Sequence, residues 1–202
     1  MNKRPPQSDP PVFRSRKPKR ISSPVWLFSA LRKTRSEARF PGKDGFMKIM
    51  VSACLTGIKV KYSGGSNYSE ALLAFVSGHD VIPVCPEVLG GLPVPREPAE
   101  IVNGTVTDRT GKSVDSAFRC GAAAVLRIAE EEKPDLIVLQ SRSPSCGVRE
   151  IYDGSFSGKK IPGTGITAKL LLEHGFRVID VAELSLFSNA EHAVSLAGFE
   201  NI

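Results

Sequence analysis

The sequence predicts an α/β fold, a single Rossmann-like domain with one parallel sheet and helices on both faces of that sheet. Short apolar segments rich in Val and Ile, which have the length of buried strands, alternate along the chain with segments of helical periodicity. Strand–helix–strand crossovers are right-handed and keep successive strands parallel. We expect this domain to occupy residues 47–184, with the carboxyl ends of its strands at one edge of the sheet.

Residues 1–46 are predicted to form a disordered basic tail. They are rich in Pro, Arg, Lys and Ser, and they hold 12 Lys and Arg residues against 3 Asp and Glu, whereas the rest of the chain holds 15 against 18. The net charge of +6 therefore comes from the tail, and we do not expect the core to bind nucleic acid. Because Met47 directly precedes the first strand, the tail is either a start assigned too far upstream or a targeting segment.

The first two predicted strands each run into a cysteine. The apolar segment Ile49–Ala53 is followed by Cys54, and Asp80–Val84 is followed by Cys85. Between these strands, residues 69–76 are predicted to form a short helix that a glycine closes.

A long irregular loop and a helix are predicted next. Residues 86–101 are dense in Pro and Gly, and loops of this length inside a compact domain are usually functional. The Asn-Gly pair at 103–104 predicts the turn of a small hairpin. Residues 115–132 carry the clearest helical pattern of the chain, and a proline stops it. Cys120 lies inside that helix, so we expect it to be a small packing residue.

The third strand is Leu136–Leu139, which breaks into a Ser-, Pro- and Gly-rich loop that contains Cys146. Residues 147–162 are predicted to be a second irregular region. The glycine run that starts at Gly163 opens a further helix. The amides at that helix start either hold a polar part of a ligand or simply form a capped helix end.

The predicted domain closes with a fourth strand at residues 176–181. Residues 185–202 are expected to form a peripheral helical tail. No segment approaches the ~20 apolar residues of a membrane span, and no secretory signal peptide is evident. We therefore expect a cytoplasmic protein without membrane contact.

Three cysteines, Cys54, Cys85 and Cys146, each follow a predicted parallel strand, so all three are expected at one edge of the sheet. In a reducing compartment, clustered cysteines bind metals or act in catalysis more often than they form disulfides. Three converging thiols suggest a soft metal, with structural or incidental thiols as the alternative.

The surroundings of these cysteines argue against two common sites. Structural zinc takes four ligands, usually from closely spaced pairs, and none of the three histidines is expected at this edge. A cysteine nucleophile would also need an imidazole nearby. An iron–sulfur cluster remains, because its thiolates are spread around a cube and suit three separate strand ends. With three protein ligands, one iron keeps an open position.

Four motifs resemble one known family. They are Val-Ser-Ala-Cys-Leu at 51–55, Cys-Pro-Glu-Val-Leu-Gly-Gly-Leu-Pro-Val-Pro-Arg at 85–96, Ser-Arg-Ser-Pro-Ser-Cys-Gly at 141–147 and Ile-Tyr-Asp-Gly-Ser-Phe-Ser-Gly at 151–158. In this order, over residues 47–181, the chain resembles a bacterial family long catalogued as a domain of unknown function, which includes thiouracil desulfurases.

The resemblance implies a [4Fe-4S] cluster held by Cys54, Cys85 and Cys146. It also implies a hydrolytic, non-redox reaction on a small thiolated base. The thiocarbonyl sulfur of 2- or 4-thiouracil binds the open iron, water attacks the ring carbon, and sulfur leaves as sulfide. Whether sulfide is released or handed on stays open, as does the choice between a monomer and a homodimer.

The proposed reaction requires a residue that handles the protons of the attacking water. Glu87 is the first candidate and Glu100 the reserve, while Ser141 could bond to substrate or cluster. Each of these residues also has an ordinary structural explanation, as a loop carboxylate or a turn residue. Further expected substrate-binding residues are Arg142, Ser143, Gly163 and Thr164.

The chain departs from the family pattern at two positions near the expected substrate edge. It has Lys61-Tyr62-Ser63-Gly64 where many relatives have Arg-Tyr-Asp-Gly, and Thr164 where they often have Asp. These departures do not affect the expected cluster ligands, but they leave the identity of the substrate open. The alternatives to an enzyme are a non-catalytic module that carries the cluster for sensing or small-ligand binding, and a metal-free structural domain.

Overall fold

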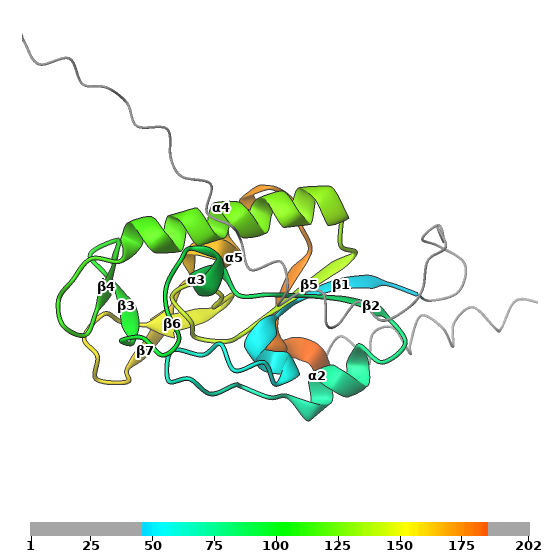
Figure 1. Ribbon diagram of the computed structural model, residues 1–202, viewed down its shortest axis with the longest axis horizontal. Coiled ribbons are helices and arrows are strands. Elements are labelled where there is room, and N and C mark those ends of the chain that lie inside the picture. Colours follow the sequence, from blue (N-terminus) through cyan, green and yellow to red (C-terminus); the bar gives the residue numbers. More distant parts are fainter. Residues whose placement is uncertain (1–45, 186–202) are drawn as a thin grey trace, which may run out of the picture. The chain divides into compact units, whose positions relative to one another are not determined.

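The computed structural model describes residues 46–185 (Figure 1). Its central sheet has four parallel strands in the order β2-β1-β5-β8, which confirms the predicted α/β fold. The strands are β1 (Lys48–Ser52), β2 (Asp80–Val84), β5 (Leu136–Leu139) and β8 (Val178–Asp180). Apart from Phe46 and Ser185, the predicted tails at 1–46 and 185–202 lie outside the described residues.

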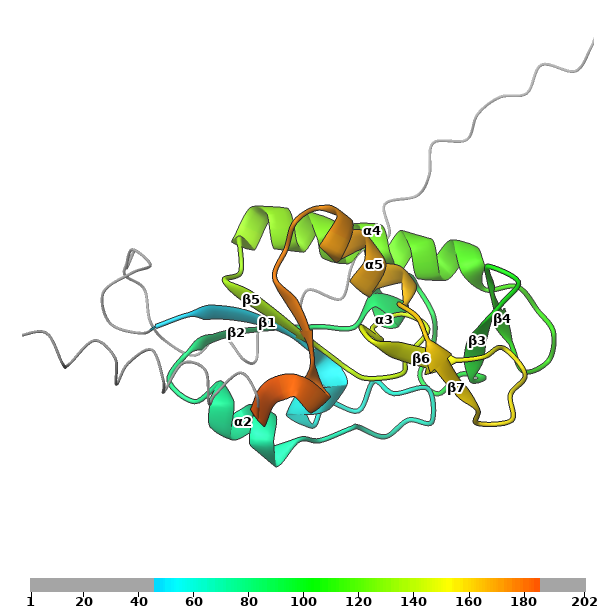
Figure 2. The same cartoon turned by 180° about the vertical axis from the view of Figure 1, so that it is seen from behind.

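Helices cover both faces of the sheet (Figures 1 and 2). On one face lie α4 (Asp115–Glu132) and α5 (Ile166–Glu173), and on the other lie α2 (Glu70–Phe75) and the 3₁₀ helices η1 (Ala53–Thr56) and η2 (Val181–Glu183). No helix in residues 46–185 is both long and apolar enough to cross a bilayer.

The apolar core follows from the alternation of side chains along the strands. Met50 and Ile137 pack with α4 and α5, whereas Ile49 and Val51 pack with α2 and η1. All four residues of β5 are 0% exposed, as expected for a central parallel strand that is covered on both faces. The core therefore fixes the two central strands from which the site loops leave.

Two antiparallel hairpins lie beyond the carboxyl ends of these strands (Figure 1). One joins β3 (Ala99–Val102) to β4 (Thr105–Asp108) through the predicted turn, where Asn103 and Gly104 have φ angles of 49° and 80°. The other joins β6 (Glu150–Tyr152) to β7 (Lys160–Pro162), inside the segment predicted to be irregular. Strands of three residues are too short to show a periodicity, so the sequence did not reveal this hairpin.

The segment predicted as one long loop at residues 86–101 also contains structure. A short helix, α3 (Pro86–Leu89), starts directly after Cys85, with proline at its first position. This helix packs closely on α4, because Gly90 and Gly121 have no side chains. A Cβ atom on Gly121 would lie 1.9 Å from the carbonyl oxygen of Pro86, and one on Gly90 would lie 2.1 Å from that of Ala117.

The prediction that Cys120 is a small packing residue was wrong, because its side chain is exposed. The buried face of α4 is formed by Phe118, Ala122, Val125 and Ala129, and Cys120 lies on the opposite side of the helix from Phe118.

Replacement of Gly121 by alanine tests the contact between α3 and α4. In an exposed helix this change stabilises by about 1 kcal/mol. Here the new methyl group meets backbone, so we expect a loss of roughly 2–3 kcal/mol and a thermal midpoint lower by several degrees. The neighbouring change Cys120→Ala should alter stability by less than about 0.5 kcal/mol. A stabilised Gly121→Ala protein would show that the helices separate without cost.

Candidate metal centre

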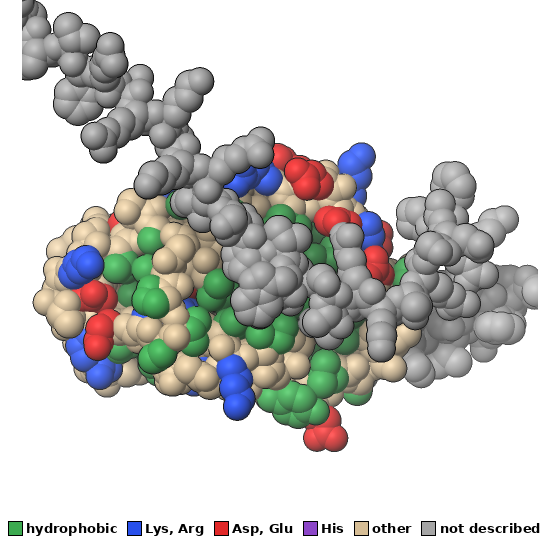
Figure 3. Space-filling view, in the orientation of Figure 1, with side chains coloured by type: hydrophobic (Ala, Val, Ile, Leu, Met, Phe, Trp, Pro, Cys, Tyr) green, Lys and Arg blue, Asp and Glu red, His purple; other side chains and the backbone are tan. Residues whose placement is uncertain are grey.

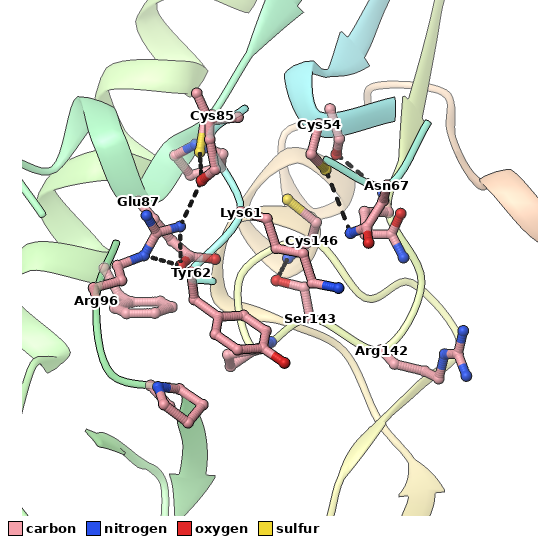
Figure 4. Close-up of a pocket in the computed structure, with 18 of the residues that line it drawn as sticks. Cys54, Lys61, Tyr62, Asn67, Cys85, Glu87, Arg96, Arg142, Ser143 and Cys146 are labelled. Atoms are coloured by element: carbon pink, nitrogen blue, oxygen red, sulfur yellow. Dashed lines mark hydrogen bonds and ion pairs between the residues drawn. The ribbon is translucent and has the colours of Figure 1, made fainter. Parts of the chain in front are cut away.

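Cys54, Cys85 and Cys146 line one cavity of about 370 Å³ (Figure 4). Cys54 lies in η1 directly after β1, Cys85 caps α3 directly after β2, and Cys146 lies in the loop that follows β5. Because β1 pairs with both β2 and β5 in parallel, the three loops leave the sheet side by side. The predicted convergence of the three cysteines is therefore present.

The loop before Cys146 is shaped by Ser143. Its hydroxyl oxygen accepts hydrogen bonds from the amides of Ser145 (3.1 Å) and Cys146 (3.2 Å), and its carbonyl accepts from the amide of Gly147 (2.8 Å). A Cβ atom on Gly147 would lie 2.7 Å from the carbonyl oxygen of Glu150. Backbone contacts on several sides thus hold the Cys146 thiol in place.

The three thiols are free and buried in different degrees. Burial raises the pKa of Cys54 to about 11, against a hydrogen bond from Asn67 Nδ2 to its sulfur (3.7 Å) that lowers it. Burial is also the largest cause that raises the pKa of Cys85, and it raises that of fully buried Cys146 most strongly. Without a cation, all three groups are therefore neutral thiols at neutral pH.

The sulfur atoms are spread around the cavity and do not meet at one point (Figure 4). Among residues 46–185, no group of three His, Cys, Asp or Glu side chains is arranged to hold a single metal ion. His79 is at the opposite edge of the sheet, where its Nδ1 accepts from the amide of Met47 (3.2 Å). This arrangement disfavours a single zinc ion and suits a larger group with several soft metal atoms.

Glu87 lies on the cavity wall two residues after Cys85. Its Oε2 receives hydrogen bonds from Nε of Arg96 (2.7 Å) and lies 2.6 Å from the Nη2 of the same guanidinium. Arg96 in turn donates to the carbonyl of Val60 (3.0 Å), which also accepts from the thiol of Cys85 (4.0 Å). The side chains of Arg96 and Glu87 are 7% and 17% exposed, so this ion pair fixes a nearly buried carboxylate beside the thiols.

Glu100, the reserve candidate, also lines the cavity but has a structural task. Its Oε2 accepts hydrogen bonds from the amides of Gly154 (2.9 Å) and Phe156 (3.1 Å), which joins the β3–β4 hairpin to the loop between β6 and β7. Ser141, Arg142 and Ser143 line the cavity as well. The long side chain of Arg142 extends away from the sulfur atoms in Figure 4.

The structure does not bring Gly163 and Thr164 to the cavity. The amide of Gly163 donates to the carbonyl of Arg149 (3.1 Å), and the hydroxyl of Thr164 to that of Val148 (3.4 Å). The next amides, from Gly165 to Ala168, donate to carbonyls of residues 144–147. The amides at this helix start are therefore already bonded to backbone carbonyls.

The sequence did not single out Asn67 and Arg96 as site residues, and it marked Lys61 and Tyr62 only as departures from the family pattern near the expected substrate edge. Asn67 contacts the Cys54 sulfur across 13 positions of sequence, and Lys61 lies over the ring of Tyr62 with its Nζ 5.4 Å from the ring centroid. Arg96 stood at the end of a quoted motif, but only the fold shows that it pairs with Glu87. Lys61, Tyr62, Asn67 and Arg96 all line the cavity.

Comparison with known proteins gives consistent results. A family model described as 2-thiouracil desulfurase matches residues 49–183. The uncharacterized protein YbbK of Bacillus subtilis (strain 168) is 43% identical over 147 residues, which cover 68% of this chain and 97% of that protein. A solved structure described as the [4Fe-4S]-dependent thiouracil desulfidase TudS is 37% identical, with a TM-score of 0.65, over 72% of this chain and 98% of that one.

Removal of Arg96 tests the buried ion pair. Arg96→Ala leaves the Glu87 carboxylate buried without its cation, so we expect a loss of about 3–5 kcal/mol of unfolding free energy. The matched control is Arg149→Ala, which breaks a pair with Glu183 (2.8 Å) at a side chain that is 68% exposed. There we expect a loss of at most about 1 kcal/mol. Denaturant unfolding of both variants measures the difference, and similar losses would contradict this account.

Proposed function

The chain belongs to the 2-thiouracil desulfurase family, and from this membership we propose that it is a [4Fe-4S]-dependent desulfurase of thiolated pyrimidine bases such as 2- or 4-thiouracil. The observation that carries the proposal is the cavity wall formed by Cys54, Cys85 and Cys146. These soft ligands come from three separate strand ends, and in residues 46–185 no His, Asp or Glu joins them in a single-ion site.

The donor set fits the proposed cluster. Three thiols spread around one cavity match the corners of a four-iron cube better than the tetrahedron of a single ion. Deprotonation of a buried thiol becomes favourable only when a cation takes the place of the proton. The iron ions of a cluster would be such cations. When bound, the cluster would supply an iron without a protein ligand, a Lewis acid for the soft sulfur of a thiocarbonyl group.

Glu87 is the proposed acid–base residue. Arg96 holds its Oε2, and no hydrogen-bond partner within the described residues is found for Oε1, which can therefore accept a proton from water in the cavity. In the overall reaction, oxygen from water replaces sulfur on the ring carbon, and the sulfur leaves with the two hydrogens of that water, either as H₂S or as hydrosulfide and a proton. No electrons are gained or lost, so the protein needs only to move protons and position the base.

The polar residues of the 141–143 loop are the proposed substrate contacts. Ser141 and Ser143 line the same cavity as the thiols and Glu87. Glu100 is a weaker candidate for proton transfer, because two amides already bond to its Oε2.

Metal analysis of cysteine variants tests the cluster. We expect anaerobically prepared protein to contain about four iron and four sulfide per chain. Cys54→Ala, Cys85→Ala and Cys146→Ala should each lose most of this iron. Cys120→Ala removes an exposed thiol on α4 and should keep all of it. Full iron content in any of the first three variants would remove that cysteine from the ligand set.

The role of Glu87 is tested by the change Glu87→Gln, which keeps the side-chain shape. We expect normal iron content, a lower unfolding free energy because Arg96 loses its charge partner, and in the folded, loaded protein a fall of about 100-fold or more in the rate of sulfide release from 4-thiouracil. Glu100→Gln should instead act mainly through stability, as a lower thermal midpoint. A larger rate loss in Glu100→Gln would exchange the two roles.

A full cluster without turnover on any thiolated base would favour the sensing module over the enzyme.

A further inference from the structure

Ser141 lies between two cavities. It lines the cavity of the cysteines, and it also lines a second cavity of about 320 Å³ whose wall includes Asp180 at the end of β8. The register of the sheet explains this position, since Leu139 of β5 pairs with Asp180. Asp180 therefore stands directly behind the loop that carries Ser141.

The hydrogen bond between these two residues has a fixed direction. The hydroxyl of Ser141 donates to Oδ1 of Asp180, and Oδ1 also accepts from the amide of Ala182 (2.9 Å). A serine hydroxyl has one hydrogen and two lone pairs. With its hydrogen given to Asp180, Ser141 can only accept hydrogen bonds from a molecule in the cysteine cavity.

Asp180 is an unusual group for its position. It is 3% exposed, and in the described part of the chain no hydrogen-bond donor reaches its Oδ2. Buried carboxylate oxygens are normally satisfied, so a carboxylate left partly unsatisfied calls for an explanation. Its Oδ1 remains a strong acceptor, and a hydrogen bond to a charged carboxylate is about twice as strong as a neutral one.

A capping role explains only part of this arrangement. Asp180 caps η2 through the amide of Ala182, while its own amide donates to Oε2 of Glu183 (3.1 Å). Serine or asparagine would cap η2 equally well. Capping does not account for the bond from Ser141.

We propose that Asp180 is a positioning residue, which turns the Ser141 hydroxyl hydrogen away from the cysteine cavity and leaves Ser141 as a hydrogen-bond acceptor for the substrate. The inference rests on the proposed function, because it selects thiocarbonyl rings with an N–H group beside the C=S group. In 4-thiouracil this group is N3–H. An N3-methyl derivative has no hydrogen to give, and the acceptor then faces a methyl group.

The experiment compares ring pairs that differ only at N3, using anaerobically prepared full-length protein. Calorimetry measures the dissociation constants of uracil and 3-methyluracil, and sulfide release measures kcat and KM for 4-thiouracil and its N3-methyl derivative. For wild type we expect a preference of roughly 10- to 100-fold for the N–H compound in both measurements, the effect of one lost buried hydrogen bond.

Three variants separate the orientation of the Ser141 hydroxyl from the cap of η2 and from the size of the side chain at position 180. Asp180→Ser keeps the cap but cannot reach Ser141, so the hydroxyl can rotate and the preference should fall to about 3-fold or less. Asp180→Asn keeps a carbonyl oxygen for both donors and should retain most of the preference. Glu183→Gln perturbs the cap and removes the ion pair with Arg149, but it leaves the bond between Ser141 and Asp180 in place, so it should leave the ratio as in wild type. Thermal unfolding and iron content confirm that each variant is folded and loaded.

The possible results distinguish this inference from the proposed function. A wild-type ratio in Asp180→Ser would overturn the inference, because steric exclusion by Ser141 persists in that variant. Equal binding of uracil and 3-methyluracil to wild type, or no binding of either, would overturn it too. If uracil binds selectively but no thiolated base releases sulfide, the proposed function fails and the role of Asp180 stands.

Discussion

The removal of three thiols from water is the constraint on which the rest of this structure depends. A parallel sheet gives the chain a simple way to gather them, because the loops after β1, β2 and β5 leave from one edge. The cost is that Cys54, Cys85 and Cys146 all become difficult to ionise. Hydrogen bonds offset only part of this burial, because those from Asn67 to Cys54, from the Val88 amide to Cys85 and from Ser52 to Cys146 lower each pKa by less than burial raises it. The Glu87 carboxylate in the same wall is already paired with Arg96 (Figure 4).

Close main-chain contacts surround the backbone at this edge. Glycines at 90, 121, 147 and 165 let carbonyl groups approach where any side chain would clash, so α3 and the 143–147 loop are each held by main-chain contacts. Cys85 and Cys146 are therefore carried by tightly packed segments of the backbone. The outer surface is different in character, because acidic and basic side chains are interspersed over the face of the described residues seen in Figure 3.

Much of the fold could be read from the sequence, and the failures have physical reasons. The residue patterns of the strands and of the long helix α4 are clear enough to predict these elements. Cysteines that follow parallel strands are expected at one edge of the sheet. The strands β6 and β7 and the helix α3 are too short for such a pattern, and they form because neighbouring elements supply partners. The exposure of Cys120 could have been predicted from the helical pattern, because Cys120 falls outside the buried stripe formed by Phe118, Ala122, Val125 and Ala129. Pairs such as Asn67 with Cys54, or Asp180 with Ser141, exist only once distant segments have met.

The wide separation of the three cysteines along the chain has a consequence for assembly. A group bound to all of them would tie three distant loops together, and such a cross-link removes more conformational entropy from an unfolded chain than from a folded one. Binding free energy at the centre would then also be folding free energy. In a cell short of iron, such a protein would lose resistance to proteolysis together with its activity, so its abundance would follow the iron supply.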